Sequence, residues 1–104
     1  MKISILTPTF NRAKEIERLY TSLIVNSNSN IKFEWLIMDD GSEDKTRIQV
    51  DNFIKQNIIN IEYYSEQNQG KMSAINNLMK HVTGDICVTC DSDYYFEVGA
   101  FDKI

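Results

Sequence analysis

Apolar positions along the chain follow two patterns that alternate with each other. Short and nearly continuous apolar runs predict buried strands, whereas apolar residues spaced three or four apart predict helices. Helical stretches separate the successive apolar runs. The strands are expected at residues 2–7, 33–38, 59–64 and 85–90.

The helical stretches carry their own start and stop signals. Asn11 is predicted to cap the first helix and Ser42 the second, because Asn and Ser side chains accept hydrogen bonds from free helix N–H groups. The third helix is expected to open at Gly70 and to end at Gly84, since glycine often follows the last helical turn. The faces expected to be buried contain Ile16, Leu19, Tyr20, Leu23 and Ile24 in the first helix, Val50, Phe53 and Ile54 in the second, and Met72, Ile75, Leu78, Met79 and Val82 in the third.

The alternation of strands and helices predicts an α/β fold. Because the strand runs are apolar throughout, we expect a Rossmann-like, mainly parallel sheet of about four strands with helices on both faces. Pro8 is expected to end the first strand, since proline cannot donate to a central ladder. The 104 residues are enough for one hydrophobic core and too few for two, which predicts a single domain.

Composition narrows the classes of partner and compartment. The chain has 15 acidic and 11 basic residues with no basic cluster, which argues against nucleic-acid binding. No apolar run approaches the roughly 20 residues of a membrane span, and the first residues lack the pattern of a secretory signal, so a cytoplasmic location is expected. Cys87 and Cys90 lie three apart in a predicted strand and face opposite sides, so core packing is expected for them rather than a shared metal or a disulfide.

Polar segments follow three of the predicted strands. They are Thr9-Phe10-Asn11, Asp39-Asp40 and Asp91-Ser92-Asp93. Ligands of parallel α/β folds bind where the carboxyl ends of the strands meet. The three segments are therefore expected to gather at one edge of the sheet.

The chemistry of these segments favours an anionic ligand together with a metal. Asp91 and Asp93 point to the same side of an extended chain, and paired carboxylates attract hard divalent ions such as Mg²⁺ or Mn²⁺. Asp40 can accept a hydrogen bond from a nucleobase, and Phe10 offers a flat apolar face. Lys71 lies at a predicted helix start, where free N–H groups favour phosphate. Taken singly, each feature also fits a solvated turn, a helix cap or a core residue.

Five segments together carry a resemblance. They are ILTPTFNR at 5–12, WLIMDDGS at 35–42, EQNQGK at 66–71, TGDI at 83–86 and DSD at 91–93. In this order they resemble the family 2 glycosyltransferases, which have a GT-A fold. The resemblance covers essentially the whole chain and the first half of such a domain. The family's acidic motif often continues with a further acid, where this chain has Tyr94.

The resemblance implies the transfer of a sugar, with inversion, from a nucleotide-diphosphate donor to an acceptor hydroxyl. The expected donor is a UDP-sugar, the expected acceptor is a saccharide or a lipid-linked compound, and the expected cofactor is Mn²⁺ or Mg²⁺. Residues 1–104 would form the donor-binding part, with the acceptor-binding half outside the chain. Family analogy assigns the metal to Asp93 with Asp91. It assigns the nucleotide-sugar to Pro8, Thr9, Phe10, Asp39, Asp40, Lys71, Asn76, Asp91 and Ser92.

The general base that activates the acceptor is expected beyond Ile104, because no residue of the chain is an evident candidate. The alternatives are a nucleotide-binding module without catalysis, an inactive truncated fragment, a phospho-receiver domain and a purely structural α/β fragment. A receiver carries its acidic pair after the first strand, whereas here the pair follows the second. A missing half would leave an edge and apolar surface exposed, which predicts self-association or marginal stability. The family also allows a peripheral position at the inner face of the membrane.

Overall fold

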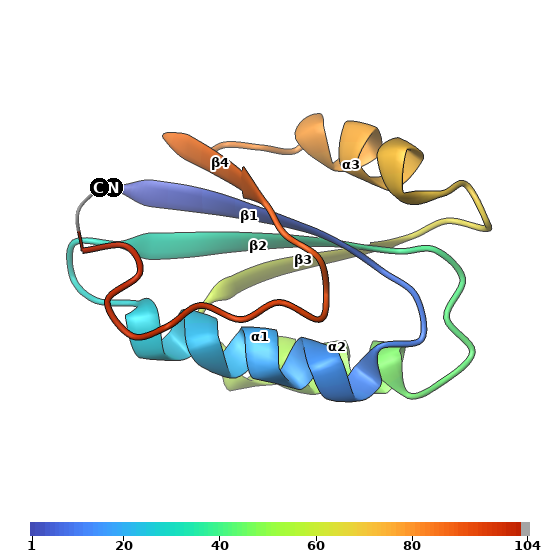
Figure 1. The fold of residues 1–104 in the computed structure, drawn as a ribbon, viewed down its shortest axis with the longest axis horizontal. Coiled ribbons are helices and arrows are strands. Elements are labelled where there is room, and N and C mark those ends of the chain that lie inside the picture. The colour runs from blue at the N-terminus through green and yellow to red at the C-terminus, as the bar shows by residue number, and fades with distance from the viewer. Residues whose placement is uncertain (103–104) are drawn as a thin grey trace.

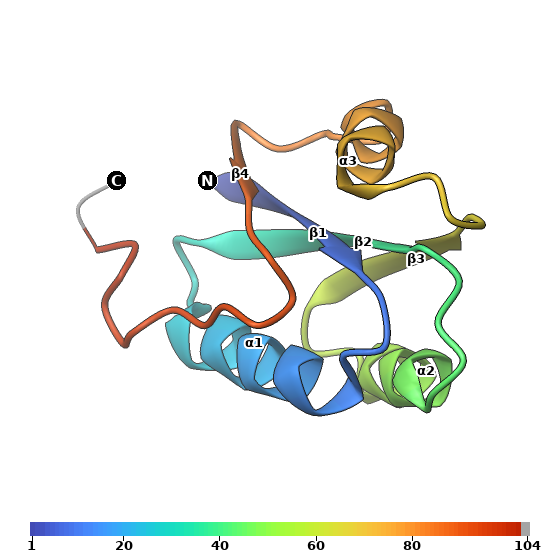
Figure 2. The same ribbon diagram turned by 45° about the vertical axis from the view of Figure 1, so that its right-hand side comes forward.

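The computed structural model describes residues 1–102 and contains a four-stranded parallel sheet with helices on both faces (Figure 1). The strands are β1 (Lys2–Thr9), β2 (Lys32–Asp39), β3 (Asn60–Ser65) and β4 (Ile86–Thr89), and the helices are α1 (Ala13–Asn26), α2 (Thr46–Gln56) and α3 (Lys71–Met79). Helices α1 and α2 cover one face of the sheet, and α3 lies on the other (Figure 2). This arrangement confirms the predicted α/β fold.

The order in which the chain adds strands to the sheet changes direction at β1. The strand order is β3-β2-β1-β4, so the chain first moves from β1 to β2 and β3. It then returns through α3 to β4 on the far side of β1. The carboxyl ends of β1 and β4 therefore lie side by side where the strand order changes direction, and such a switch point is where α/β folds bind ligands.

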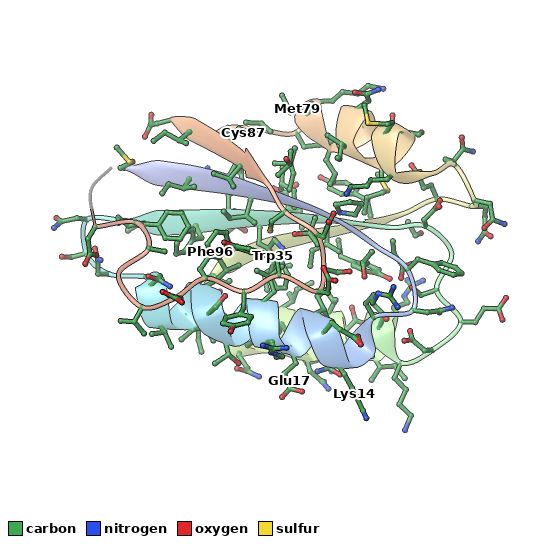
Figure 3. The ribbon with its side chains drawn as sticks, viewed as in Figure 1. Lys14, Glu17, Trp35, Met79, Cys87 and Phe96 are labelled. Atoms are coloured by element: carbon green, nitrogen blue, oxygen red, sulfur yellow. The ribbon has the colours of Figure 1, made fainter. Side chains whose placement is uncertain are left out.

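Aromatic rings form the core between the sheet and the helices α1 and α2. Trp35 of β2 is fully buried, and its Nε1 donates to the hydroxyl of Thr7 at 2.9 Å. Tyr20 and Phe53 stack with their ring centroids 3.9 Å apart, and each centroid is 6.2 Å from that of Trp35. Figure 3 shows Trp35 in the layer between the sheet and α1. This packing fixes the central strands from one side.

The opposite face of the sheet is only partly covered. Helix α3 packs on β1 and β2 through Ala74 and Leu78, which are buried. Met72 and Met79 were expected in the buried stripe but are 70% and 49% exposed. That prediction was wrong because α3 lies over the two central strands and does not extend over β4. Figure 3 shows Met79 on the same side of the sheet as Cys87.

Two further expectations about buried residues are wrong. Ile54 of α2 is 40% exposed, because it lies at the margin of the helix face that Val50 and Phe53 turn toward the sheet. Cys87 is exposed, whereas Cys90 packs against the core. Cys90 lies one residue after β4, and the two cysteines face opposite sides of the sheet, as predicted; both thiols are free.

The first two helices begin after their predicted caps. Helix α1 begins at Ala13 and α2 at Thr46, so neither Asn11 nor Ser42 is a cap residue. Instead, the backbone N–H of Asn11 donates to the Ser42 hydroxyl at 2.8 Å. The side chains that local pattern assigns to helix ends are thus used to tie two loops together.

Gly84 and Pro8 also have roles that differ from those predicted. Helix α3 stops at Met79, and Gly84 lies before β4, where a Cβ atom would come within 2.5 Å of Ser4 Oγ. Glycine therefore allows the chain to approach β1 closely. Pro8 lies inside β1 rather than after it. The ladder between β4 and β1 ends beside Leu6, so the nitrogen of Pro8 faces a side where β4 has already diverged and no donor is required.

The segment after β4 folds back over α1, as Figure 1 shows. Asn26 holds this segment, since its Nδ2 donates to the Glu97 carbonyl at 3.1 Å and its Oδ1 accepts from the Gly99 N–H at 3.0 Å. Phe101 then packs against Phe33, with ring centroids 5.1 Å apart. Among residues 1–102, no helix has the length and apolar character to cross a membrane.

Candidate functional site

An open cavity of about 300 Å³ lies at the carboxyl edge of the sheet. The loops after β1, β2 and β4 and the start of α3 form its walls. This is the switch point at which the topology predicts a ligand. The lining residues are Pro8, Thr9, Phe10, Arg12, Asp40, Gly70, Lys71, Ala74, Asp91, Ser92 and Asp93.

A larger hollow of about 770 Å³ lies at the opposite, amino edge of the sheet. The first two residues, the loop before β2 and Asp85 contribute to its lining. The Asp85 carboxylate is already engaged, because it accepts the backbone N–H of Lys2 at 3.0 Å. None of the predicted site residues lines this hollow, so the smaller cavity is the better candidate.

All of the predicted site residues except Asp39 and Asn76 line the smaller cavity. Asp39 is buried, and its carboxylate accepts the backbone N–H of Ser42 at 2.7 Å and the hydroxyl of Tyr63. Burial and this bond raise the pKa of the Tyr63 hydroxyl. Asp39 therefore supports the turn that carries Asp40. Asn76 is exposed on α3, and its contact with a nucleotide stays a prediction.

The carboxylate of Asp40 organises the loop that leads into α3. Its Oδ1 accepts the backbone N–H of Gln69 at 2.7 Å, and its Oδ2 accepts that of Gly70 at 3.1 Å. Gly70 has a φ of 86°, which glycine adopts without the strain of a side chain. A carboxylate offers about four lone-pair positions, so Asp40 can still accept a bond from a ligand. Asp40 thereby holds the first turn of α3 against the cavity.

A cation and a carboxylate meet at the cavity wall. Lys71 Nζ lies 2.5 Å from Asp91 Oδ1, which joins the first residue of α3 to the loop after β4. The two side chains are 59% and 56% exposed, so water screens the pair and it adds little stability. A metal at Asp91 or a phosphate at Lys71 can therefore replace either partner at small cost.

Asp91 and Asp93 are the candidates for a metal site. Both line the cavity, and carboxylate oxygens are the ligands that Mg²⁺ and Mn²⁺ take. Within the described part of the chain, no group of three or more His, Cys, Asp or Glu side chains is placed to hold a metal. This donor set fits an ion that keeps water and substrate oxygens as its remaining ligands.

Comparison with known proteins identifies the family. The model of "Glycosyl transferase family 2" matches residues 4–104. The chain belongs to glycosyl transferase family 2. An uncharacterized glycosyltransferase of Mycoplasma genitalium is 33% identical over 99 residues, an alignment that covers 92% of this chain and 33% of the relative. The dolichol-phosphate mannosyltransferase of Pyrococcus furiosus is 28% identical over 93 residues, covering 89% of this chain and 26% of the relative.

The fold of this family 2 chain agrees with solved glycosyltransferases and confirms the predicted GT-A architecture. Residues 1–349 of Staphylococcus aureus TarS, in complex with UDP-GlcNAc, give a TM-score of 0.87 at 28% identity over 99% of this chain and 30% of that chain. The mannosyltransferase PcManGT of Pyrobaculum calidifontis, in complex with GDP-Man and Mn²⁺, gives a TM-score of 0.82 at 26% identity over 90% of this chain and 28% of that chain. The chain spans about a third of the length of the relatives it matches.

The cavity of this family 2 chain contains one cation that the sequence reasoning did not select. Arg12 lines the cavity, is exposed, and forms no salt bridge with any of residues 1–102. Lys71, by contrast, is already paired with Asp91. The signal that could have found Arg12 is its place directly after Phe10 and Asn11, in the loop that leaves the first strand.

Thr9 supplies a further polar group at the cavity wall. It is 4% exposed, and its hydroxyl oxygen has no hydrogen-bond partner among the described residues. A buried polar atom without a partner costs about 1–3 kcal/mol.

Proposed function

We propose that this chain is the donor-binding part of an inverting, metal-dependent glycosyltransferase that uses a UDP-sugar. The convergence of Asp40, Lys71 and the pair Asp91 and Asp93 in one cavity carries the proposal. These groups suit a nucleobase, a diphosphate and a divalent metal in turn. TarS has a similar fold and has been solved with UDP-GlcNAc and with UDP, which supports this choice of donor.

The nucleobase is proposed to bind between Phe10 and Asp40. The Phe10 ring is 48% exposed and offers an apolar face on which a base can stack. Asp40 accepts a hydrogen bond from the ring N–H of uracil, a group that cytosine lacks. Pro8 and Thr9 border the nucleotide at the end of β1, where both residues line the cavity.

The diphosphate is proposed to lie at the N-terminus of α3. The free N–H groups of the first turn and the ammonium of Lys71 supply positive charge there. Asp91 and Asp93 would hold Mn²⁺ or Mg²⁺, which when bound supplies positive charge against the departing diphosphate. Lys71 then exchanges its contact with Asp91 for a phosphate oxygen. PcManGT and the glucosyl-3-phosphoglycerate synthase of Mycobacterium tuberculosis, both solved with Mn²⁺, support the choice of metal.

The acceptor is proposed to be the hydroxyl of a saccharide or of a lipid-linked compound. Its oxygen bonds to the anomeric carbon while the bond from that carbon to the diphosphate breaks, and the hydroxyl proton passes to a general base. We place that base in the portion of the relatives that this chain does not span. The dolichol-phosphate named for one relative supports a lipid-linked acceptor, and the poly(ribitol-phosphate) named for another supports a polyol hydroxyl as acceptor.

Calorimetric titration of the chain with UDP tests the donor site. Binding is expected in Mn²⁺ and is expected to be about tenfold weaker or more without a divalent ion, because Asp91 and Asp93 then repel the diphosphate. Asp93→Asn is expected to weaken the Mn²⁺-dependent binding by about 30-fold, since the variant removes the charge of a metal ligand.

Asp51→Asn is the matched control for this titration. Asp51 is exposed on α2 and does not line the cavity, so the same change of charge should leave the affinity for UDP as it is. Equal affinities of wild type and Asp93→Asn would refute the metal site. A folded wild-type chain that fails to bind UDP would refute the donor function altogether.

A further inference from the structure

The loops that follow β1 and β2 are tied together by Asn11. Its backbone N–H donates to the Ser42 hydroxyl at 2.8 Å. Its Oδ1 accepts the backbone N–H groups of Glu43 at 2.8 Å and of Asp44 at 3.3 Å. A fourth bond crosses in the same place, from the Ala13 N–H to the Asp44 carboxylate at 3.3 Å. These four bonds are called the Asn11 clamp below.

The Asn11 clamp is connected to the core of the domain. Ser42, which receives the Asn11 N–H, donates its own backbone N–H to Asp39 Oδ1 at 2.7 Å. The second oxygen of Asp39 accepts the hydroxyl of Tyr63 on β3. A continuous series of hydrogen bonds therefore runs from β3 to the loop after β1, and it holds that loop relative to the rigid sheet.

The backbone of Asn11 places its two neighbours in the cavity. Its φ of 51° lies in the left-handed region, which asparagine adopts more readily than most residues. Phe10 before it and Arg12 after it both line the cavity, whereas Asn11 does not. The side chain of Asn11 is instead bonded to the loop after β2. Asn11 thus acts on the site only through the residues beside it.

We propose that Asn11 is a positioning residue for the nucleotide donor, an inference that rests on the proposed function. It holds Phe10 and Arg12 in a fixed place relative to Asp40, so that the base and the diphosphate meet a preformed wall. A preformed wall binds more tightly because little loop ordering is left to occur on binding. When the clamp is lost, the contacting groups are unchanged, but the ligand must order their loop.

Two substitutions of Asn11 test the proposal. Asn11→Ala removes the acceptor and is expected to raise the Kd for UDP with Mn²⁺ by about tenfold, since two hydrogen bonds that order the loop are lost. Asn11→Asp keeps an oxygen in the same place and is expected to remain within about threefold of wild type. Both are measured by calorimetry at a temperature where circular dichroism shows every variant folded.

Asn57→Ala is the matched control for the backbone. Asn57 follows α2 with a φ of 54°, and it does not line the cavity. Its replacement therefore imposes the same left-handed strain on alanine far from the site. It should lower the melting temperature as Asn11→Ala does, while the Kd for UDP stays that of wild type.

A double-mutant cycle with Phe10→Ala separates positioning from general destabilisation. In the Phe10→Ala background, Asn11→Ala should weaken UDP binding by only about threefold, because the ring that the clamp holds is gone. The positioning role would be overturned if Asn11→Ala had the wild-type Kd for UDP. It would also be overturned if the double variant raised the Kd by the full product of the two single increases. If folded wild type binds no UDP, the proposed function fails first and this inference fails with it.

Discussion

Asp40→Ala is expected to weaken the binding of UDP in Mn²⁺ by about 100-fold. The variant loses the proposed acceptor for the uracil N–H, and it also frees the backbone N–H groups of Gln69 and Gly70 that the carboxylate holds. A hydrogen bond to a charged group contributes about 1.5–3 kcal/mol, so the lost base contact alone corresponds to about tenfold or more. The loosened start of α3, which carries Lys71, accounts for the rest.

A comparison of UDP with CDP separates the two effects of Asp40→Ala. Cytosine has a ring nitrogen without hydrogen where uracil has its N–H, so CDP loses the proposed ring bond to Asp40 and keeps only its exocyclic amino group as a donor on that edge of the base. Wild type is expected to prefer UDP by about tenfold, and the variant is expected to bind both nucleotides with similarly low affinity. Asp51→Ala on α2 is the control for the loss of a carboxylate outside the cavity. A preference for UDP that survives in Asp40→Ala would exclude Asp40 as the group that reads the base.

Glu34→Ala is expected to lower the free energy of unfolding by about 3 kcal/mol at neutral pH. Glu34 lies in β2 and is 1% exposed. Its carboxylate accepts the Ser4 hydroxyl at 2.7 Å and, from Thr83, the backbone N–H at 2.9 Å and the hydroxyl at 2.6 Å, and it pairs with Lys2 Nζ at 3.2 Å. Its removal leaves these donors without their acceptor at the point where β1, β2 and the turn before β4 meet.

The stability of the wild-type chain should depend on the protonation of Glu34. Burial by itself raises the pKa of this carboxyl, but the hydrogen bonds from Thr83 and Ser4 outweigh it and lower the pKa to about 2. A carboxyl with a lower pKa in the folded state stabilises the fold above its unfolded pKa of about 4.3. That stabilisation, about 3 kcal/mol, is lost as the pH falls from about 5 to about 2.

Urea unfolding, followed by the fluorescence of Trp35, measures the loss of stability in Glu34→Ala and the pH dependence of the stability of the wild-type chain. Glu34→Gln has no charge to lose at this position, so its stability should fall less steeply than that of wild type between about pH 5 and about pH 2. Glu43→Gln is the control, because Glu43 is exposed in the loop after β2. Identical acid profiles for wild type and Glu34→Gln would show that the buried carboxylate does not contribute as described.

The order of the elements could be predicted because it depends on patterns within a few residues. Apolar runs and helical stripes can be recognised without knowing which surface each element packs against. The exposed methionines Met72 and Met79 show that a helical stripe does not by itself identify the residues that are buried. Which side of an apolar stripe is buried depends on the width of the surface beneath it, and α3 covers only the two central strands. The caps predicted at Asn11 and Ser42 failed for a related reason, since each side chain found a partner in the other's loop.

The loops that form the candidate site could be predicted from the sequence, whereas the roles of single residues could not. Asp39 and Asp40 are adjacent and alike in sequence, yet Asp39 is buried against Tyr63 whereas Asp40 lines the cavity. Successive residues at the end of a strand point to opposite sides, and only the position of the sheet decides which side is the core. Arg12 was missed because a lone arginine after a strand has no local signature of a site.

The sequence by itself determined the fold class, the family and the residue types that reach the carboxyl edge of the sheet, because each of these depends on short motifs and local periodicity. Only the tertiary structure decided the partners of Asn11 and Glu34. Asn11 bonds to Glu43, 32 residues away, and Glu34 bonds to Ser4 and Thr83, 30 and 49 residues away. Contacts of this kind depend on how strands and loops are placed in space, and no local pattern of residues specifies that placement.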